Sequence, residues 1–127
     1  MDIRAIALYT TASIVLVTAS GIPFGVLAAR GERAIESPLY QLLQYSVAFL
    51  VRFSVFYRLF TLILKAPILS AILIAVLSYS ISVLAFYWVT GIRTPLLLIY
   101  IDALLNGTAM CFAAVACKSR GTFGIRA

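Results

Sequence analysis

The chain has 127 residues, of which 64% are hydrophobic and only 11% are charged. A soluble domain is about 45–50% apolar and ~25% charged, so the composition excludes an ordinary soluble fold and indicates a protein built for lipid. The formal net charge is +6. The basic residues form no face interleaved with exposed aromatic side chains, and we therefore expect no nucleic-acid partner.

Long uncharged runs define the predicted membrane spans. Residues 5–29 and 66–92 contain no charged side chain, and each run exceeds the roughly 20 apolar residues that an α-helix needs to cross a ~30 Å hydrocarbon core. The hydrophobic pattern predicts four transmembrane helices, over residues 5–29, 38–60, 66–91 and 95–117. The expected fold class is all-α, with two helical hairpins in a single transmembrane domain over residues 1–127.

The first predicted helix carries Gly21 and Gly25, which lie one helical turn apart. This GxxxG spacing lets a second backbone approach closely. The motif is common in membrane helices, so we interpret the pair as a helix-packing contact rather than as a gating hinge.

The second predicted helix has a polar stripe, because Gln41, Gln44, Tyr45, Ala48 and Arg52 recur on one face. A polar stripe within a span should face protein or a water-filled cavity, not acyl chains. We expect this stripe to meet the fourth helix.

Arg52 has two possible roles, as the partner of an acid in the fourth helix or as a charge near the headgroups. Counting 1.5 Å per residue from the predicted helix starts puts Arg52 about 22 Å deep and Asp102 about 12 Å deep. The difference exceeds the comfortable reach of one side chain, whereas Gln44 and Tyr45 match the depth of Asp102. We therefore favour an Arg52 side chain that snorkels toward the headgroups.

The connections carry signals for helix ends. Ser37-Pro38 and Thr94-Pro95 each place a hydroxyl residue at the predicted N-cap and a proline at the first helical position. Gly91 is expected to end the third helix.

The fourth predicted helix contains Asp102, the only acid expected inside a span, with Asn106 one turn later. The same face continues through Ala109, Ala113 and Cys117, so the helix offers a polar and then a small-residue stripe to a neighbour. An ionised carboxylate at this depth has to pair, become protonated or face water. Asp102 is either a proton, cation or substrate contact, or an interhelical clamp, and we favour the clamp.

The chain contains no histidine, and Cys111 and Cys117 lack the spacing of metal ligands. It also lacks a Gly-rich phosphate loop, a GxSxG motif and paired carboxylates. We expect no metal, no cofactor and no enzymatic activity.

The distribution of positive charge predicts the orientation. With four spans, one side of the membrane collects six basic residues and the other side collects three. The six are Arg4, Arg58, Lys65, Lys118, Arg120 and Arg126, and the three are Arg30, Arg33 and Arg93. The positive-inside rule then places both termini in the cytoplasm, and we expect a bacterial inner-membrane protein that also contacts anionic lipids.

The two halves of the chain align at Ser37-Pro38-Leu39 and Thr94-Pro95-Leu96, and a basic, aromatic segment, residues 52–60, ends the second helix. In these features, in length and in its four-span layout, the chain resembles the GtrA-like family of small bacterial membrane proteins. The resemblance covers the layout and a few residues. It implies a role in moving polyprenyl-linked sugars across the membrane.

Two functions are compatible with these patterns. The chain could be a non-enzymatic accessory subunit that binds partner helices of a larger membrane assembly, or that self-associates. Alternatively, it could be a small oligomeric translocator of a lipid-linked or amphipathic substrate. Its contact residues would be Asp102, Asn106, Gln44, Tyr45 and Arg52. We favour the subunit, because four helices with few polar groups supply little chemistry.

Overall fold

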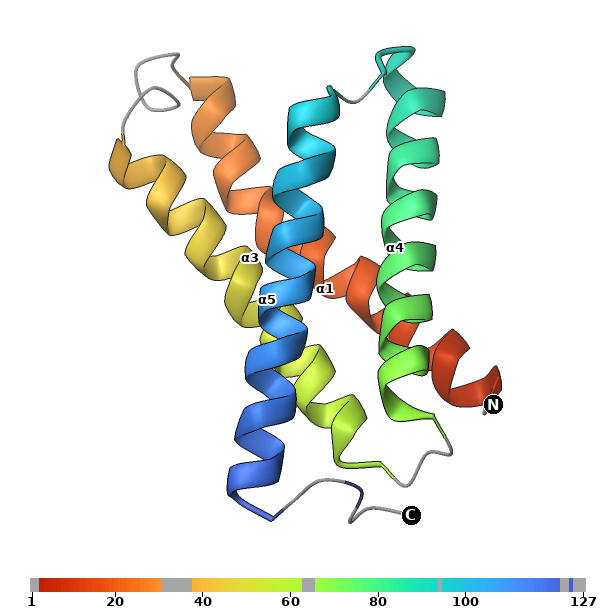
Figure 1. The fold of residues 1–127 in the computed structure, drawn as a ribbon. Helices are drawn as coiled ribbons and strands as arrows, with labels where there is room; N and C mark the ends of the chain where they lie inside the picture. The colour runs from red at the N-terminus through yellow and green to blue at the C-terminus, as the bar shows by residue number, and fades with distance from the viewer. Residues whose placement is uncertain (1–2, 31–37, 63–65, 94, 122–123, 125–127) are drawn as a thin grey trace.

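The computed structural model describes residues 3–30, 38–62, 66–93, 95–121 and 124. The described residues form four helices, α1 (Ile3–Arg30), α3 (Pro38–Phe60), α4 (Pro67–Thr90) and α5 (Leu96–Ser119), which are shown in Figure 1. Each helix is long and apolar enough to cross a membrane. The predicted all-α class with four membrane spans is confirmed, and the helix ends differ from the predicted ones by only a residue or two.

One predicted helix start is confirmed and one is shifted. Helix α3 begins at Pro38 as expected. Pro95 was expected at the first position of the fourth helix, but it is the N-cap residue, with φ −59° and ψ 144°, and α5 begins at Leu96. The expected capping residues Ser37 and Thr94 lie outside the described residues.

Gly91 ends α4, as the sequence predicts. Its φ of 70° lies in the left-handed region, which glycine adopts without the steric penalty of a Cβ atom. The Gly91 N–H donates a 2.7 Å hydrogen bond to the carbonyl oxygen of Tyr87, which satisfies one of the last helical carbonyls.

The helices pack in an order that differs from their order in the chain. Helix α5 packs most extensively against α3, and α1 packs against both α3 and α4. The consecutive helices α4 and α5 are not among the closely packed pairs, and Figure 1 shows α3 running obliquely across α5. The last helix is therefore held mainly by the second span rather than by its own hairpin partner.

The hydrophobic core lies at one end of the bundle, where α3 ends and α4 begins. Its buried members are Phe56, Leu59, Phe60, Ala71, Ile74, Ala109, Ala113 and Cys117. The last three form the predicted small-residue stripe of α5, which is confirmed as a packing face. Small side chains let α5 approach α3 closely, so this end is sealed by apolar contacts.

The opposite end, where α1 ends and α5 begins, is held together differently. The Tyr40 hydroxyl of α3 donates a 2.7 Å hydrogen bond to the carbonyl oxygen of Phe24 in α1. The two rings also meet edge to face, with centroids 5.6 Å apart. This contact ties α1 to α3 at the end opposite the buried core, here called the open end.

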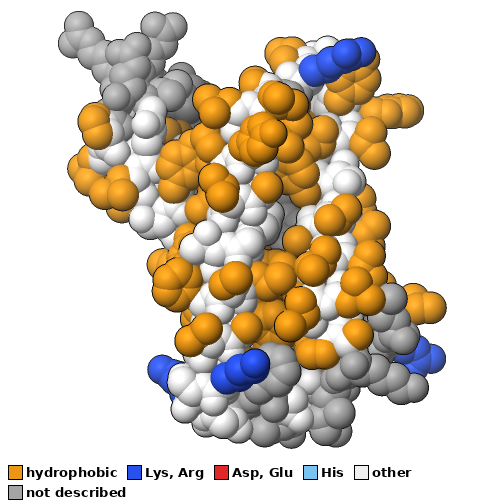
Figure 2. Space-filling model, viewed as in Figure 1, with side chains coloured by type: hydrophobic (Ala, Val, Ile, Leu, Met, Phe, Trp, Pro, Cys, Tyr) orange, Lys and Arg blue, Asp and Glu red, His pale blue; other side chains and the backbone are white. Residues whose placement is uncertain are grey.

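The outer surface suits a lipid environment. Figure 2 shows hydrophobic side chains over most of the visible face, with Lys and Arg at its two ends. Large exposed apolar residues occur on all four helices, among them Leu8, Leu42, Leu84 and Leu104. Exposed apolar area on this scale is unfavourable in water and expected against acyl chains.

Candidate functional site

An ion pair between α3 and α5 forms the centre of the candidate site. Arg52 Nη2 donates to Asp102 Oδ1 at 3.0 Å. The Arg52 side chain is 9% exposed and the Asp102 side chain is 33% exposed. Two charges in a hydrocarbon environment are tolerated when they neutralise each other. The carboxylate, with a third of its surface free, remains accessible from within the bundle.

The expectation that Arg52 snorkels away from Asp102 is therefore wrong. The depth count assumed that the second and fourth helices run parallel to the membrane normal, whereas α3 is inclined relative to α5 (Figure 1). An inclined helix descends by less than 1.5 Å per residue. Arg52 consequently lies closer in depth to Asp102, and its long side chain covers the remaining distance.

A hollow of about 110 Å³, here called the central hollow, lies beside the ion pair. All four helices contribute to its wall, which is lined by Ser13, Ile14, Val17, Arg52, Ser78, Tyr79, Ser82, Asp102 and Asn106. Most of these side chains are polar. A cavity with polar groups in its wall, next to a neutralised charge pair, can hold water or the polar head of a ligand.

A second hollow, of about 230 Å³, reaches the same ion pair from between α1 and α3 and is called the α1–α3 hollow. Its polar lining residues include Ser20, Gln44 and Tyr45. The predicted polar stripe of the second helix thus faces a cavity at Gln44, Tyr45, Ala48 and Arg52, whereas Gln41 is exposed and does not line it. Both hollows lie on the side of the bundle away from the buried core, so the ion pair lies between open space and the sealed end.

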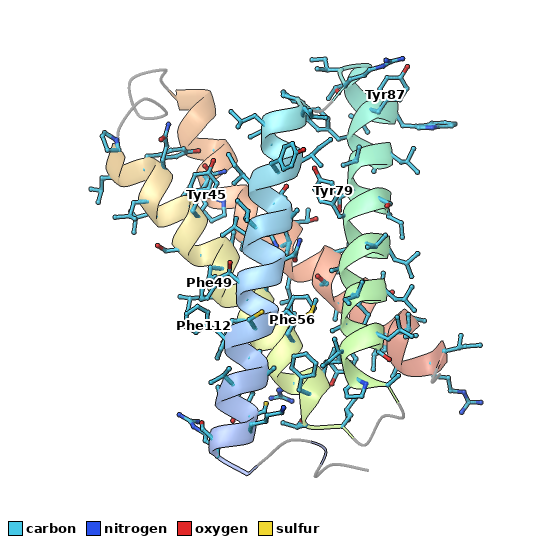
Figure 3. The ribbon with its side chains drawn as sticks, viewed as in Figure 1. Tyr45, Phe49, Phe56, Tyr79, Tyr87 and Phe112 are labelled. Atoms are coloured by element: carbon cyan, nitrogen blue, oxygen red, sulfur yellow. The ribbon has the colours of Figure 1, made fainter. Side chains whose placement is uncertain are left out.

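The structure brings together most of the site residues expected from the sequence. Asn106 lies beside Asp102 in the central hollow, and Gln44, Tyr45, Arg52 and Asp102 share the α1–α3 hollow. Figure 3 shows Tyr45 near the upper part of α3. The polar groups of α3 and α5 therefore converge on one region of the bundle.

The expected helix-packing contact at Gly21 and Gly25 is not seen at Gly21. A Cβ atom added at Gly21 would meet nothing within 4 Å, so no neighbouring helix of the described chain packs closely there. Gly21 instead lines the α1–α3 hollow. The surroundings of Gly25 lie outside the described residues, and packing of this pair against another molecule stays a prediction.

Two hydrogen-bond donors in the site have no partner within the described part of the chain. They are Arg52 Nη1 and the Tyr79 hydroxyl, both buried atoms. By contrast, the neighbouring serine hydroxyls donate within their own helix, since Ser78 bonds to the carbonyl oxygen of Ile74 and Ser82 to that of Ser78. Both residues line the central hollow, and buried donors of this kind normally have a hydrogen-bond partner.

Sequence reasoning missed the contributions of α1 and α4 to this site. Ser78 and Ser82 lie one turn apart in α4 with Tyr79 beside them, and this spacing was the available signal for a polar face. Single hydroxyl residues in membrane helices usually bond to their own backbone, so their spacing alone does not indicate a binding site.

The described residues contain no group of three or more His, Cys, Asp or Glu side chains that could hold a metal ion. Cys111 is exposed and Cys117 is buried, and the Cys117 thiol contacts the Tyr57 carbonyl oxygen at 3.6 Å. The chemistry available at the site is therefore that of one ion pair, hydroxyl groups and amides.

Comparisons with protein-family models, with curated proteins and with solved structures find no match to this chain. The fold and the site define the chain as an integral membrane protein whose described residues include four membrane-spanning helices and an Arg–Asp ion pair beside two hollows.

Proposed function

We propose that the protein is a small translocator, working as an oligomer, that binds an amphipathic substrate at the Arg52–Asp102 pair and moves its polar head through the bilayer. The observation that carries this proposal is the ion pair at the boundary between open polar hollows and a sealed apolar end. A charge pair that only clamped two helices would be expected to lie in tight packing, not beside two cavities.

The asymmetry of the bundle supports the same function. A carrier has to admit its substrate on one side while the other side stays closed, and then reverse that state. Here the hollows reach Arg52 from one end, and Phe56, one turn further along α3, belongs to the apolar core that closes the other end. The buried arginine would attract an acceptor on the substrate head, and Asp102 would keep the unoccupied site neutral.

The cellular placement is part of this proposal. The sealed end carries Arg4, Arg58, Lys118 and Arg120, and the described residues of the open end include Arg93. This distribution favours a cytoplasmic sealed end with both termini inside the cell. We place the protein in a bacterial inner membrane, with the hollows open to the outside.

Flux through reconstituted vesicles tests the proposal. The probe is a chain-labelled fluorescent lysophosphatidylglycerol, and its movement between leaflets is followed by quenching with an impermeant reductant. We expect Asp102→Asn to abolish protein-dependent movement, because the neutral amide leaves Arg52 without its counter-charge. Thr108→Val, at an exposed position outside the hollows, should move the probe at the native rate. Native movement in Asp102→Asn would contradict the translocator role.

The accessory-subunit role remains a second candidate, and an exposed amide outside the α1–α3 hollow favours it. Gln41 is exposed on α3 and is not among the residues that line this hollow, and an amide inside a bilayer gains from contact with a partner helix. Purification in mild detergent distinguishes the two roles. A stoichiometric partner that is lost in Asp102→Asn would support the subunit, and a uniform homo-oligomer with bound lipid would support the translocator.

A further inference from the structure

The two spare donors at the central hollow suggest the chemistry of a ligand head. Arg52 is more than nine-tenths buried, and its Nη1 atom has no partner among the described residues, like the Tyr79 hydroxyl. An unsatisfied buried donor is costly, and one on a charged group costs more. Both residues line the central hollow, so an acceptor group bound there would lie beside both side chains.

A third hollow, of about 260 Å³, lies between α4 and α5 and is called the α4–α5 hollow. Its wall is largely apolar and includes Ile72, Val76, Ile99 and Met110. It shares Tyr79 and Asn106 with the central hollow, and Figure 3 shows the Tyr79 side chain in the space between the two helices. The hollow that holds the ion pair and a more apolar hollow therefore meet at these two shared residues.

The gap between α4 and α5 gives a hydrocarbon chain access from the lipid. These two helices are not among the closely packed pairs. Gly107 lines the gap, and a Cβ atom added there would meet nothing within 4 Å. The volume of the α4–α5 hollow lies just below the usual ~300–1,000 Å³ of ligand pockets. A hollow of this size fits one hydrocarbon chain better than two.

The charges restrict the head group. Asp102 already occupies Arg52 Nη2, and the guanidinium fork has further donors for a second acceptor. A second anion brings repulsion from the Asp102 carboxylate, so a head with a single negative charge fits better than a doubly charged phosphate monoester.

We infer that the α4–α5 hollow and the central hollow together form a lateral binding site for a single-chain amphiphile with a singly charged anionic head. The head accepts hydrogen bonds from Arg52 Nη1 and from the Tyr79 hydroxyl. The chain lies between α4 and α5, beside Gly107, and comes from the membrane rather than from water. This inference takes its ligand class from the proposed translocator function and adds the location, the charge and the route of access.

Binding of spin-labelled stearate to the full chain in phosphatidylcholine vesicles tests the site. The measured quantity is the motionally restricted fraction of the label in electron paramagnetic resonance spectra. We expect a saturable restricted fraction with the native protein and its loss in Gly107→Leu, whose side chain occupies the gap. Thr108→Leu, at the next residue and on the exposed surface, is the matched control and should bind as the native protein does.

A second pair of measurements tests the head. Tyr79→Phe should weaken stearate binding about tenfold, as the loss of one hydrogen bond to a charged acceptor does. The spin-labelled methyl ester, which has no charge, should show no saturable binding.

Three results would overturn the inference. The first is native binding in Gly107→Leu, and the second is equal binding of the methyl ester. The third is displacement of the label by acetate at concentrations that leave the membrane unchanged, because it would mean that the ligand comes from water. The assay needs no flux, so a protein that binds stearate as expected but moves no lipid would refute the translocator proposal while leaving the site in place.

Discussion

Arg52 and Asp102 place opposite charges within hydrogen-bond distance inside a span. The net contribution of such a pair to stability is small, because the desolvation of both groups offsets their attraction. Removing one partner is a different matter, since the other charge is then left without compensation in a medium of low dielectric constant. The pair is therefore best probed by comparing single and double substitutions.

We expect Arg52→Met to lower the free energy of unfolding by about 2 kcal/mol, below the ~3–5 kcal/mol typical of fully buried pairs because Asp102 is partly exposed. The double variant Arg52→Met with Asp102→Leu should recover most of that loss. The measurement is equilibrium unfolding in mixed detergent micelles. Additive losses in the double variant would show that the two charges are not coupled.

The four helices differ in how they are held, and α5 depends on its small-residue face. Ala109, Ala113 and Cys117 are fully buried, while Val115 on the same helix is 65% exposed. Aromatic side chains complete the contact with α3, where Phe49 and Phe112 meet edge to face with centroids 6.0 Å apart. Figure 3 shows these two rings on adjoining parts of the helices.

Enlarging the buried face should separate the two helices. Ala113→Leu is expected to lower the free energy of unfolding by about 1–3 kcal/mol, because the added atoms meet a filled core. Val115→Leu adds volume on the lipid-facing side of the same helix and should leave stability within about 0.5 kcal/mol of the native value. Unfolding in detergent measures both, and equal effects would contradict the assignment of faces.

The sequence predicted these elements well and the site less completely. Uncharged runs and hydrophobic length determine the spans, and the spacing of Ala109, Ala113 and Cys117 determines a face, because both depend on local periodicity. The Arg52–Asp102 contact depends on the inclination of α3, which no local pattern encodes. The contribution of Tyr79 was missed for a related reason. Its side chain lines a hollow that exists because α4 and α5 do not pack closely, and that packing is a property of the assembled bundle.

At the scale of the whole molecule, the buried core and the two hollows at the ion pair occupy different parts of the bundle. The buried core joins the end of α3 to the start of α4 and the last turns of α5. The hollows lie beyond Arg52 toward the other end. Water should therefore reach the middle of the bundle from one side of the membrane only.

Thiol labelling in spheroplasts tests this asymmetry and the orientation together. In a background in which Cys111 and Cys117 are replaced by serine and alanine, Gln44→Cys should react with an impermeant maleimide, because a thiol needs contact with water to ionise and react. Ala109→Cys, in the core, should stay unlabelled until the protein is denatured. Labelling of both positions in the folded protein would refute a sealed end.

The pairing of α5 with α3 has a consequence for biosynthesis. Asp102 follows Arg52 by 50 residues, so at a translation rate of ~5–20 residues per second the acid is made about 3–10 s after the arginine. During those seconds the Arg52 guanidinium group lacks the Asp102 carboxylate that neutralises it in the folded bundle. The insertion machinery then has to accommodate an unpaired arginine until the last span is made. A ribosome that stalls before that span would release a product with an unneutralised charge in the membrane, which quality-control proteases can recognise.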